Sequence, residues 1–261
     1  GSLRTTSGVL SLNGSNWSNS GTIEAAGGRV ELYGAWDSSA GTLAASSSAI
    51  AFGSTFSPSK LGTVTRGSTG IFEIANGGTF DLYEATYDLG AYGHLGSLIL
   101  ANGSTVQNGT LSSTNPSATL NLGNSAQATL SSVTLGPGLV TNVNYSSTLV
   151  AVNGLNLDGG TLNLNPNYGA TATLRFDGAG PQSLSGTGRI LNNVNGYGYS
   201  SITTAAGASL DIGAGISLTQ QNNNAPLSIT NLSSNQGSLR TTSGVLSLNG
   251  SNWSNSGTIE A

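Results

Sequence analysis

Short alternations of apolar and polar residues recur along the whole chain and usually end at a glycine or an asparagine. Alternation over three to five residues is typical of short β-strands with one buried face, because successive side chains point to opposite sides. No apolar stripe of 3.6-residue period is long enough to predict a helix. We expect strands at these apolar pairs: Leu10/Leu12, Val30/Leu32, Phe72/Ile74, Phe80/Leu82, Leu98/Leu100, Leu120/Leu122, Val150/Val152, Leu155/Leu157, Leu162/Leu164, Leu174/Phe176, Leu210/Ile212, Ile216/Leu218 and Leu227/Ile229.

Glycine pairs such as Gly77-Gly78 and Gly159-Gly160 stand at the breaks between the expected strands, where sharp corners need a positive φ. A β-sandwich would use longer strands joined as hairpins, whereas these segments are uniformly brief. The pattern therefore favours an all-β, right-handed parallel β-helix in which each coil stacks on the one before. At about 20–24 residues per coil, a unit of 236 residues would make roughly ten to twelve coils.

The sequence of residues 1–25 is repeated without change at the end of the chain, as residues 237–261. Long identical periods are typical of tandem arrays. We expect residues 1–236 to be one full solenoid unit and residues 237–261 to begin the next identical unit in the same continuous solenoid. The initiating methionine, a signal peptide and an apolar span of about 20 residues are all missing, so we interpret the chain as a window from a longer array, without membrane contact.

Charged residues make up only 7% of the chain, against about 25% in typical soluble domains. A solenoid explains this, because equivalent residues of stacked coils lie about 4.8 Å apart. Like charges at that spacing repel by roughly 1 kcal/mol even in water. Serine, threonine and asparagine can instead form hydrogen bonds from coil to coil. The composition thus predicts neutral polar outer faces.

The remaining composition excludes several classes of partner. The net charge is −4 and the seven lysines and arginines are scattered, so nucleic acid is not an expected partner. Cysteine is absent, which excludes disulfides and thiolate metal sites. Asp158 and Asp177 each precede a glycine but lack the calcium-binding nonapeptide pattern, so we interpret them as turn residues and expect no metal or other cofactor.

Two phrases resemble a known family. Residues 17–34, WSNSGTIEAAGGRVELYG, and residues 182–190, QSLSGTGRI, are similar to repeats of giant bacterial surface proteins, namely filamentous haemagglutinins and autotransporter passenger domains. The resemblance implies a right-handed β-helix exported to the cell surface that acts as an adhesin or structural fibre. It transfers no catalytic residue, because the phrases contain none.

Candidate chemistry is sparse. A β-helix polysaccharide lyase or hydrolase would need clustered carboxylates, but the acidic residues are thinly spread, and Asp81 and Glu84, with Asp88 on the same excursion, are the conceivable group. The single histidine, His94, cannot build a zinc site, which needs three or four ligands. We expect no catalytic site and interpret the acidic residues as part of a solvated loop.

One segment, residues 83–94, breaks the alternation and contains three of the eight tyrosines and the only histidine. An insertion in a solenoid coil projects from one face, often the binding face, and exposed tyrosine suits contacts. Its aromatics would alternatively fold back to plug a wider coil. The candidate residues for lateral or ligand contact are Tyr83, Glu84, Tyr87, Asp88, Tyr92 and His94.

Together these observations predict a structural repeat of a giant extracellular fibre or adhesin on a bacterial cell surface, giving mechanical reach and attachment. Its partners would be the neighbouring identical repeats of the same chain, and neighbouring fibres or surface glycans. The alternatives are a glycan-binding module that uses exposed tyrosine and asparagine, and a β-helix carbohydrate-active enzyme. A recurrent loop would favour the module, and a carboxylate cluster on one face would favour the enzyme.

Overall fold

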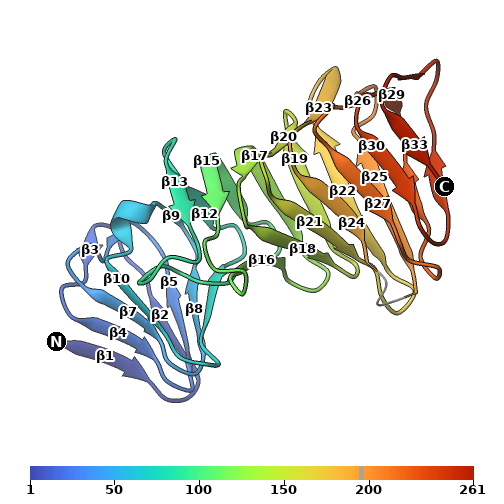
Figure 1. Ribbon diagram of the computed structural model, residues 1–261. Coiled ribbons are helices and arrows are strands. Elements are labelled where there is room, and N and C mark those ends of the chain that lie inside the picture. Colours follow the sequence, from blue (N-terminus) through green and yellow to red (C-terminus); the bar gives the residue numbers. More distant parts are fainter. Residues whose placement is uncertain (194–196) are drawn as a thin grey trace.

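The computed structural model describes residues 1–193 and 197–261, and these residues form short parallel strands joined by tight corners. The described residues contain no α-helix and one short 3-10 helix, η1 (Pro58–Lys60). The strands wind into a solenoid of about twelve stacked coils, with the two termini at opposite ends (Figure 1). The predicted parallel β-helix is therefore confirmed.

The chain visits three faces in a fixed order, which we call A, B and C. Face B is one continuous sheet of twelve parallel strands. Its strands are β2 (Val9–Leu12), β5 (Arg29–Leu32), β8 (Ala49–Phe52), β11 (Ile71–Ile74), β14 (Leu98–Leu100), β16 (Thr119–Leu122), β18 (Val140–Asn144), β21 (Thr161–Asn165), β24 (Arg189–Asn192), β27 (Ser217–Gln220), β30 (Ser238–Thr241) and β33 (Thr258–Glu260).

Faces A and C share the two long strands β15 (Thr105–Ser112) and β17 (Gln127–Leu135), whose second halves lie on face A and first halves on face C. The other strands of face A are β1 (Ser2–Thr5), β4 (Thr22–Ala25), β7 (Thr42–Ala45), β10 (Thr63–Arg66), β13 (Thr86–Asp88), β20 (Leu155–Leu157), β23 (Pro181–Gly186), β26 (Ser209–Ile212), β29 (Leu232–Asn235) and β32 (Ser254–Asn255). The others of face C are β3 (Trp17–Ser18), β6 (Trp36–Asp37), β9 (Thr55–Phe56), β12 (Thr79–Asp81), β19 (Thr148–Val152), β22 (Thr171–Asp177), β25 (Tyr199–Thr204), β28 (Leu227–Ile229) and β31 (Leu246–Leu248).

The strand register gives the length of each coil. Val9 of β2 pairs with Arg29 of β5, and most other coils on face B have a similar length. The coil that leads from Phe72 to its register partner Leu98 is longer, and so are the two successive coils that follow Thr161. The additional residues lie at the corners, where they lengthen loops and also extend strands such as β22 and β23, so the longer coils mark the places where the surface departs from a plain solenoid.

Inward-pointing residues of the three faces form one core along the axis. Aromatic rings stack through the N-terminal half of this core: the ring centroids of Phe52 and Phe72 are 6.1 Å apart, and those of Phe56 and Phe80 are 4.7 Å apart. Phe56 and Phe80 are register partners on neighbouring strands, whereas Phe52 and Phe72 lie two register positions apart and meet diagonally inside the core. The alternation read from the sequence is the pattern that places these side chains inside.

Outward-pointing amides and hydroxyls form the predicted hydrogen bonds between coils. On face B, the Nδ2 atom of Asn142 donates to Oδ1 of Asn121 at 2.8 Å, and Nδ2 of Asn163 donates to Oδ1 of Asn142 at 2.9 Å. On face C, the hydroxyls of Thr173 and Ser201 are 3.0 Å apart. A neutral amide carries both a donor and an acceptor, so the same residue can bond the coils on both sides.

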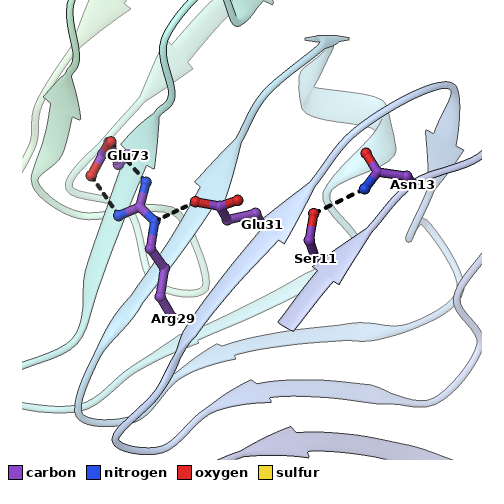
Figure 2. A network of polar contacts seen from close by, with 5 residues as sticks. All are labelled: Ser11, Asn13, Arg29, Glu31 and Glu73. Atoms are coloured by element: carbon purple, nitrogen blue, oxygen red, sulfur yellow. Dashed lines mark hydrogen bonds and ion pairs between the residues drawn. The ribbon is translucent and has the colours of Figure 1, made fainter. Parts of the chain in front are cut away.

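Several of the few charged side chains pair with one another. On face B, Arg29 bonds Glu31 of its own strand through Nε at 2.9 Å and reaches Glu73 two coils away with both terminal nitrogens at 3.0 Å (Figure 2). The strand between them places only Ala51 in register with both glutamates, so nothing bulky blocks the contact. The two carboxylates, and Glu73 above all, raise the pKa of Arg29 above its usual value. One cation thereby separates two like charges.

The two identical segments, residues 1–25 and 237–261, lie on different faces of the solenoid. Ser2 of β1 pairs with Thr22 on face A, whereas its copy Ser238 of β30 pairs with Thr258 on face B. Likewise the second and third strands of the first copy lie on faces B and C, and those of the second copy on faces C and A. The register advances by the same step in both copies, so the segment forms the same local structure on whichever face it begins.

Candidate functional site

The predicted contact segment, residues 83–94, lies in the long coil between β11 and β14. Tyr83 follows β12 at the corner leading to face A and adopts a positive φ of 50° together with Glu84 at 64°. The side chains of Tyr83 and Tyr92 are 69% and 104% exposed, so both rings project into solvent. Glu84 is exposed as well. These three residues form the outer part of the segment.

Tyr87 of β13 and His94 form its inner part. The Tyr87 ring is buried, stacks on the His94 ring at a centroid distance of 4.6 Å and meets the edge of Phe80 at 5.3 Å. Its hydroxyl accepts a hydrogen bond from the backbone N–H of Leu95 at 3.2 Å. Burial raises the pKa of Tyr87 above its usual value, so this phenol stays neutral and serves as packing inside the coil.

Hydrogen-bond donors hold the carboxylates of Asp81 and Asp88 in place. Asp88 Oδ1 accepts from the backbone N–H of Gly90 at 2.8 Å and from that of Thr114, in the next coil, at 2.9 Å. Burial opposes ionisation of Asp88, but these donors outweigh it and lower the pKa of the carboxyl. The pKa of Asp81 is lowered in the same way, with Gln107 as the strongest donor. Both carboxylates therefore act as acceptors that join coils, and a general acid would need the opposite shift.

A surface hollow of about 400 Å³ lies beside the exposed part of the segment. Tyr83 forms one wall and η1 the other. A further hollow of about 350 Å³ lies on face C, and Tyr83, Trp17 and Trp36 are among the residues that line it. The residues that line the first hollow are Ser57, Pro58, Ser59, Lys60, Leu82, Tyr83 and Ala85. The structure thus gives Tyr83 an open surface on which a partner could rest.

A second tyrosine-rich surface was missed by the sequence analysis. Tyr145 and Tyr168 follow β18 and β21 at the corner between faces B and C, and their rings meet edge to face at a centroid distance of 5.9 Å. A cleft of about 490 Å³, lined by Tyr145 and several asparagines, lies at the same corner. The sequence holds a signal for this surface, because Tyr145, Tyr168 and Tyr197 recur at intervals of about one coil and the first two directly follow an asparagine.

The described parts of the chain contain no group of three histidine, aspartate or glutamate side chains that could hold a metal ion. Within the same ranges, no helix has the length and apolar character needed to cross a membrane.

No family model and no curated protein matches this chain. Among solved structures, it is similar to the crystal structure of a TibC-catalyzed hyper-glycosylated TibA fragment, with a TM-score of 0.30 and 14% sequence identity over 100% of this chain and 97% of that chain. A similarity at this level carries no functional argument. The function proposed below therefore rests on the residues of this chain.

Proposed function

We propose that residues 1–236 are one repeat of an extracellular surface fibre in which the solenoid runs without interruption from unit to unit. The role is mechanical reach and attachment, without catalysis. The observation that carries the proposal is the junction between the units. The second copy begins at Gly237, and its first strand β30 pairs in register with β27 of the first unit.

The junction is packed like the interior of a unit. Leu239 of the second copy is fully buried and stands in register between Leu218 before it and Ile259 after it. The ion pair between Arg4 and Glu24 of the first copy recurs as Arg240 with Glu260. A linker or a polar capping coil would end a solenoid domain, and neither separates the two copies. Repeats joined in this way extend one rod.

Attachment is supported by the exposed aromatics. Tyr83 and Tyr92 project from each unit, and a contact repeated once per unit gains strength through avidity even when each single contact is weak. The neutral faces fit a long extracellular rod, because a charged ladder would repel itself along its length.

The test is the shape of a protein with three complete units in tandem. At about 4.8 Å per coil, each unit advances by about 50 Å, so negative-stain electron microscopy should show thin, unbranched rods about 150 Å long. A protein with one unit is the control and should be one third of that length. A row of separate globules, or rods whose length does not increase in proportion to the number of units, would refute the continuous fibre.

Glycan binding is the second candidate function, and one observation favours it. The asparagine-lined cleft holds Tyr145 together with uncharged hydrogen-bonding groups, and the exposed ring of Tyr168 packs against Tyr145 beside it.

A further inference from the structure

The corner between faces B and C carries an aromatic surface that the fold itself does not need. Tyr168 is 72% exposed, and Tyr197 in the next coil is 59% exposed. Tyr145 is half-buried and supports the Tyr168 ring edge to face. Exposed aromatic rings contribute little to folding, because the free energy gained by burying them is largely forgone. Three tyrosines at one corner in consecutive coils therefore require another explanation.

The backbone conformation of Tyr168 at this corner is energetically unfavourable. The turn after face B places a residue at positive φ in three consecutive coils: Ser125 at 57°, Ser146 at 57° and Tyr168 at 53°. The left-handed region is unfavourable for a residue with a side chain, and most unfavourable for bulky residues. Serine suffices at the two earlier turns. A large ring that is both strained and exposed is typical of a functional position.

Amides line the cleft beside these rings and keep hydrogen-bonding capacity free. Asn144 uses its Nδ2 to donate to the Leu122 carbonyl, and its Oδ1 has no partner among the described residues. Asn167 uses Oδ1 to accept from the Tyr168 N–H, which leaves its Nδ2 free within the described ranges. The side chain of Asn124 and the hydroxyl of Tyr145 form no hydrogen bond within the described chain. Donors and acceptors are therefore mixed and open to a ligand.

Among the described residues, the lining of the cleft carries no charged side chain, and it includes Asn124, Asn144, Tyr145, Asn165, Pro166, Asn167 and Asn193. A cleft without charge does not compensate the desolvation of an anion or a cation. A sugar fits it, because one face of a pyranose ring is apolar and covers an aromatic ring, while its hydroxyls pair with amides. We propose that this corner is a binding site for neutral oligosaccharides, with Tyr168 as the stacking platform and Asn144 and Asn167 as the hydrogen-bonding groups.

The site deepens the second candidate function and holds whether or not units are joined in an array, so the chain itself is the test protein. Isothermal titration and saturation-transfer NMR would be run with neutral oligomers of glucose, mannose, galactose and N-acetylglucosamine, and with oligogalacturonate as the acidic comparison. We expect at least one neutral oligomer to bind and its saturation transfer to arise from tyrosine protons. Binding of oligogalacturonate alone, or of no oligomer at millimolar concentration, would overturn the proposal.

Two variants separate the site from general stability. Y168S removes the ring and introduces a residue type that already adopts a positive φ at Ser125 and Ser146 of the two preceding coils, so the melting temperature should be unchanged or slightly higher. The loss of one aromatic stacking contact, worth roughly 0.5–1.5 kcal/mol, should weaken sugar binding by about threefold to tenfold. V9S removes an exposed apolar side chain of β2, in the first coil and outside both tyrosine surfaces, and should leave the affinity unchanged. Equal affinity of Y168S and the parent chain would also overturn the assignment.

A second inference follows from the strand positions of the two copies. β1 is the first strand of face A, and β29 is the eleventh. Ten full turns therefore separate β1 from β29, and β30, the copy of β1, follows one face later. We infer that a unit contains ten and one third coils, so that each unit of the proposed fibre is rotated by a third of a turn relative to the previous one.

This rotation, which rests on the proposed fibre, has a consequence for attachment. Equivalent surfaces of consecutive units point to three different sides of the rod, and the same side recurs only after three units, about 150 Å along the axis at about 4.8 Å per coil. A rod of this kind presents its contact surfaces all around its circumference. A unit with an integral number of coils would present them along a single edge.

The test uses a four-unit protein with Y92C in two chosen units, because the parent chain contains no cysteine. Maleimide-linked gold particles would be located by electron microscopy. Labels in the first and fourth units should lie on the same edge, three unit lengths apart, whereas labels in the first and second should lie on different sides, one unit length apart along the axis. Labels of the first and second units on the same edge of a straight rod would overturn the rotation alone, whereas the absence of a rod would overturn the fibre.

Discussion

The aromatic stack in the N-terminal half of the core predicts how much stability is lost when its ring contacts are removed. Phe80 of β12 is fully buried, its ring is stacked on Phe56 at 4.7 Å with an interplanar angle of 8°, and it lies nearly perpendicular to the Tyr87 ring at 5.3 Å. Phe80→Leu keeps most of the buried apolar volume but removes both ring contacts. Each such contact is worth roughly 0.5–1.5 kcal/mol beyond burial, so we expect the free energy of unfolding to fall by about 1–3 kcal/mol.

The chain provides a matched control in Phe176 of β22. This residue is also fully buried and also on face C, but no aromatic ring contacts it among the described residues. Phe176→Leu should therefore show only the cost of the shape change, which is usually below about 1.5 kcal/mol. Urea unfolding followed by circular dichroism would measure both variants, and hydrogen exchange would locate the effect, since solenoids open region by region.

The double variant Phe56→Leu with Phe80→Leu completes a cycle that isolates the stacking term. A coupling energy of about 0.5–1.5 kcal/mol is expected, together with faster amide exchange in residues 83–94, because Phe80 supports Tyr87. The reasoning is refuted if Phe80→Leu and Phe176→Leu cost the same and the coupling is zero within about 0.3 kcal/mol.

Three further predictions concern charges and glycines. Glu73→Gln removes a charged partner of Arg29, so the free energy of unfolding should fall by about 0.5–1 kcal/mol at low salt, and urea titration at molar salt should show a smaller difference. The folded pKa of Asp88 is lowered, so its ionised form stabilises the fold above the unfolded value of about 3.9, and this contribution is lost as the pH falls through the folded pKa. Asp88→Asn should flatten the fall in melting temperature below about pH 4, whereas an unchanged acid limb would contradict the assignment. Gly70→Ala would press its Cβ against the carbonyl oxygen of Ala45 in the preceding coil, and calorimetry should show a loss of about 2 kcal/mol or more; Gly123→Ala, whose Cβ would meet no atom closer than 3.4 Å, should be nearly neutral.

The stacked coils of short strands could be predicted from the sequence alone. Alternating apolar residues can only be buried on one side of a strand, and the brief strands with glycine corners left stacking of coils as the consistent arrangement. The same reasoning anticipated the amide ladders, because any outward residue must face its counterpart about 4.8 Å away. These are local and periodic properties, and for this reason they can be read without knowing which strands meet.

The candidate surfaces depended on the tertiary structure. Residues 83–94 stand out in the sequence, but only the fold divides them into an inner part, Tyr87 with His94, and an outer part, Tyr83 with Tyr92. The residue type does not distinguish the two parts, because both contain tyrosine. Tyr87 belongs to the inner part because its ring packs against Phe80. The corner of Tyr145 and Tyr168 was missed because the two residues lie a full coil apart in the sequence and meet only when the coils stack.

Buried polar positions show the same limit. Asn192 and Gln220 point inward on face B, where the preceding coil has Leu164, and they bond each other and the Ala225 carbonyl in place of apolar packing. Position in the alternation predicts that they face inward, but only the neighbouring coils supply their partners.

The position of the repeat around the axis is likewise a property of the whole structure. Identical residues 1–25 and 237–261 form the same short coil, because coil length and register are fixed by local sequence. The face on which each copy begins is decided by the summed lengths of all coils in between, including the three long coils whose loops add residues without adding a turn. The number of residues alone does not say how many turns they form, because residues added to a coil add no turn. The strand pairing in three dimensions gives the number of turns.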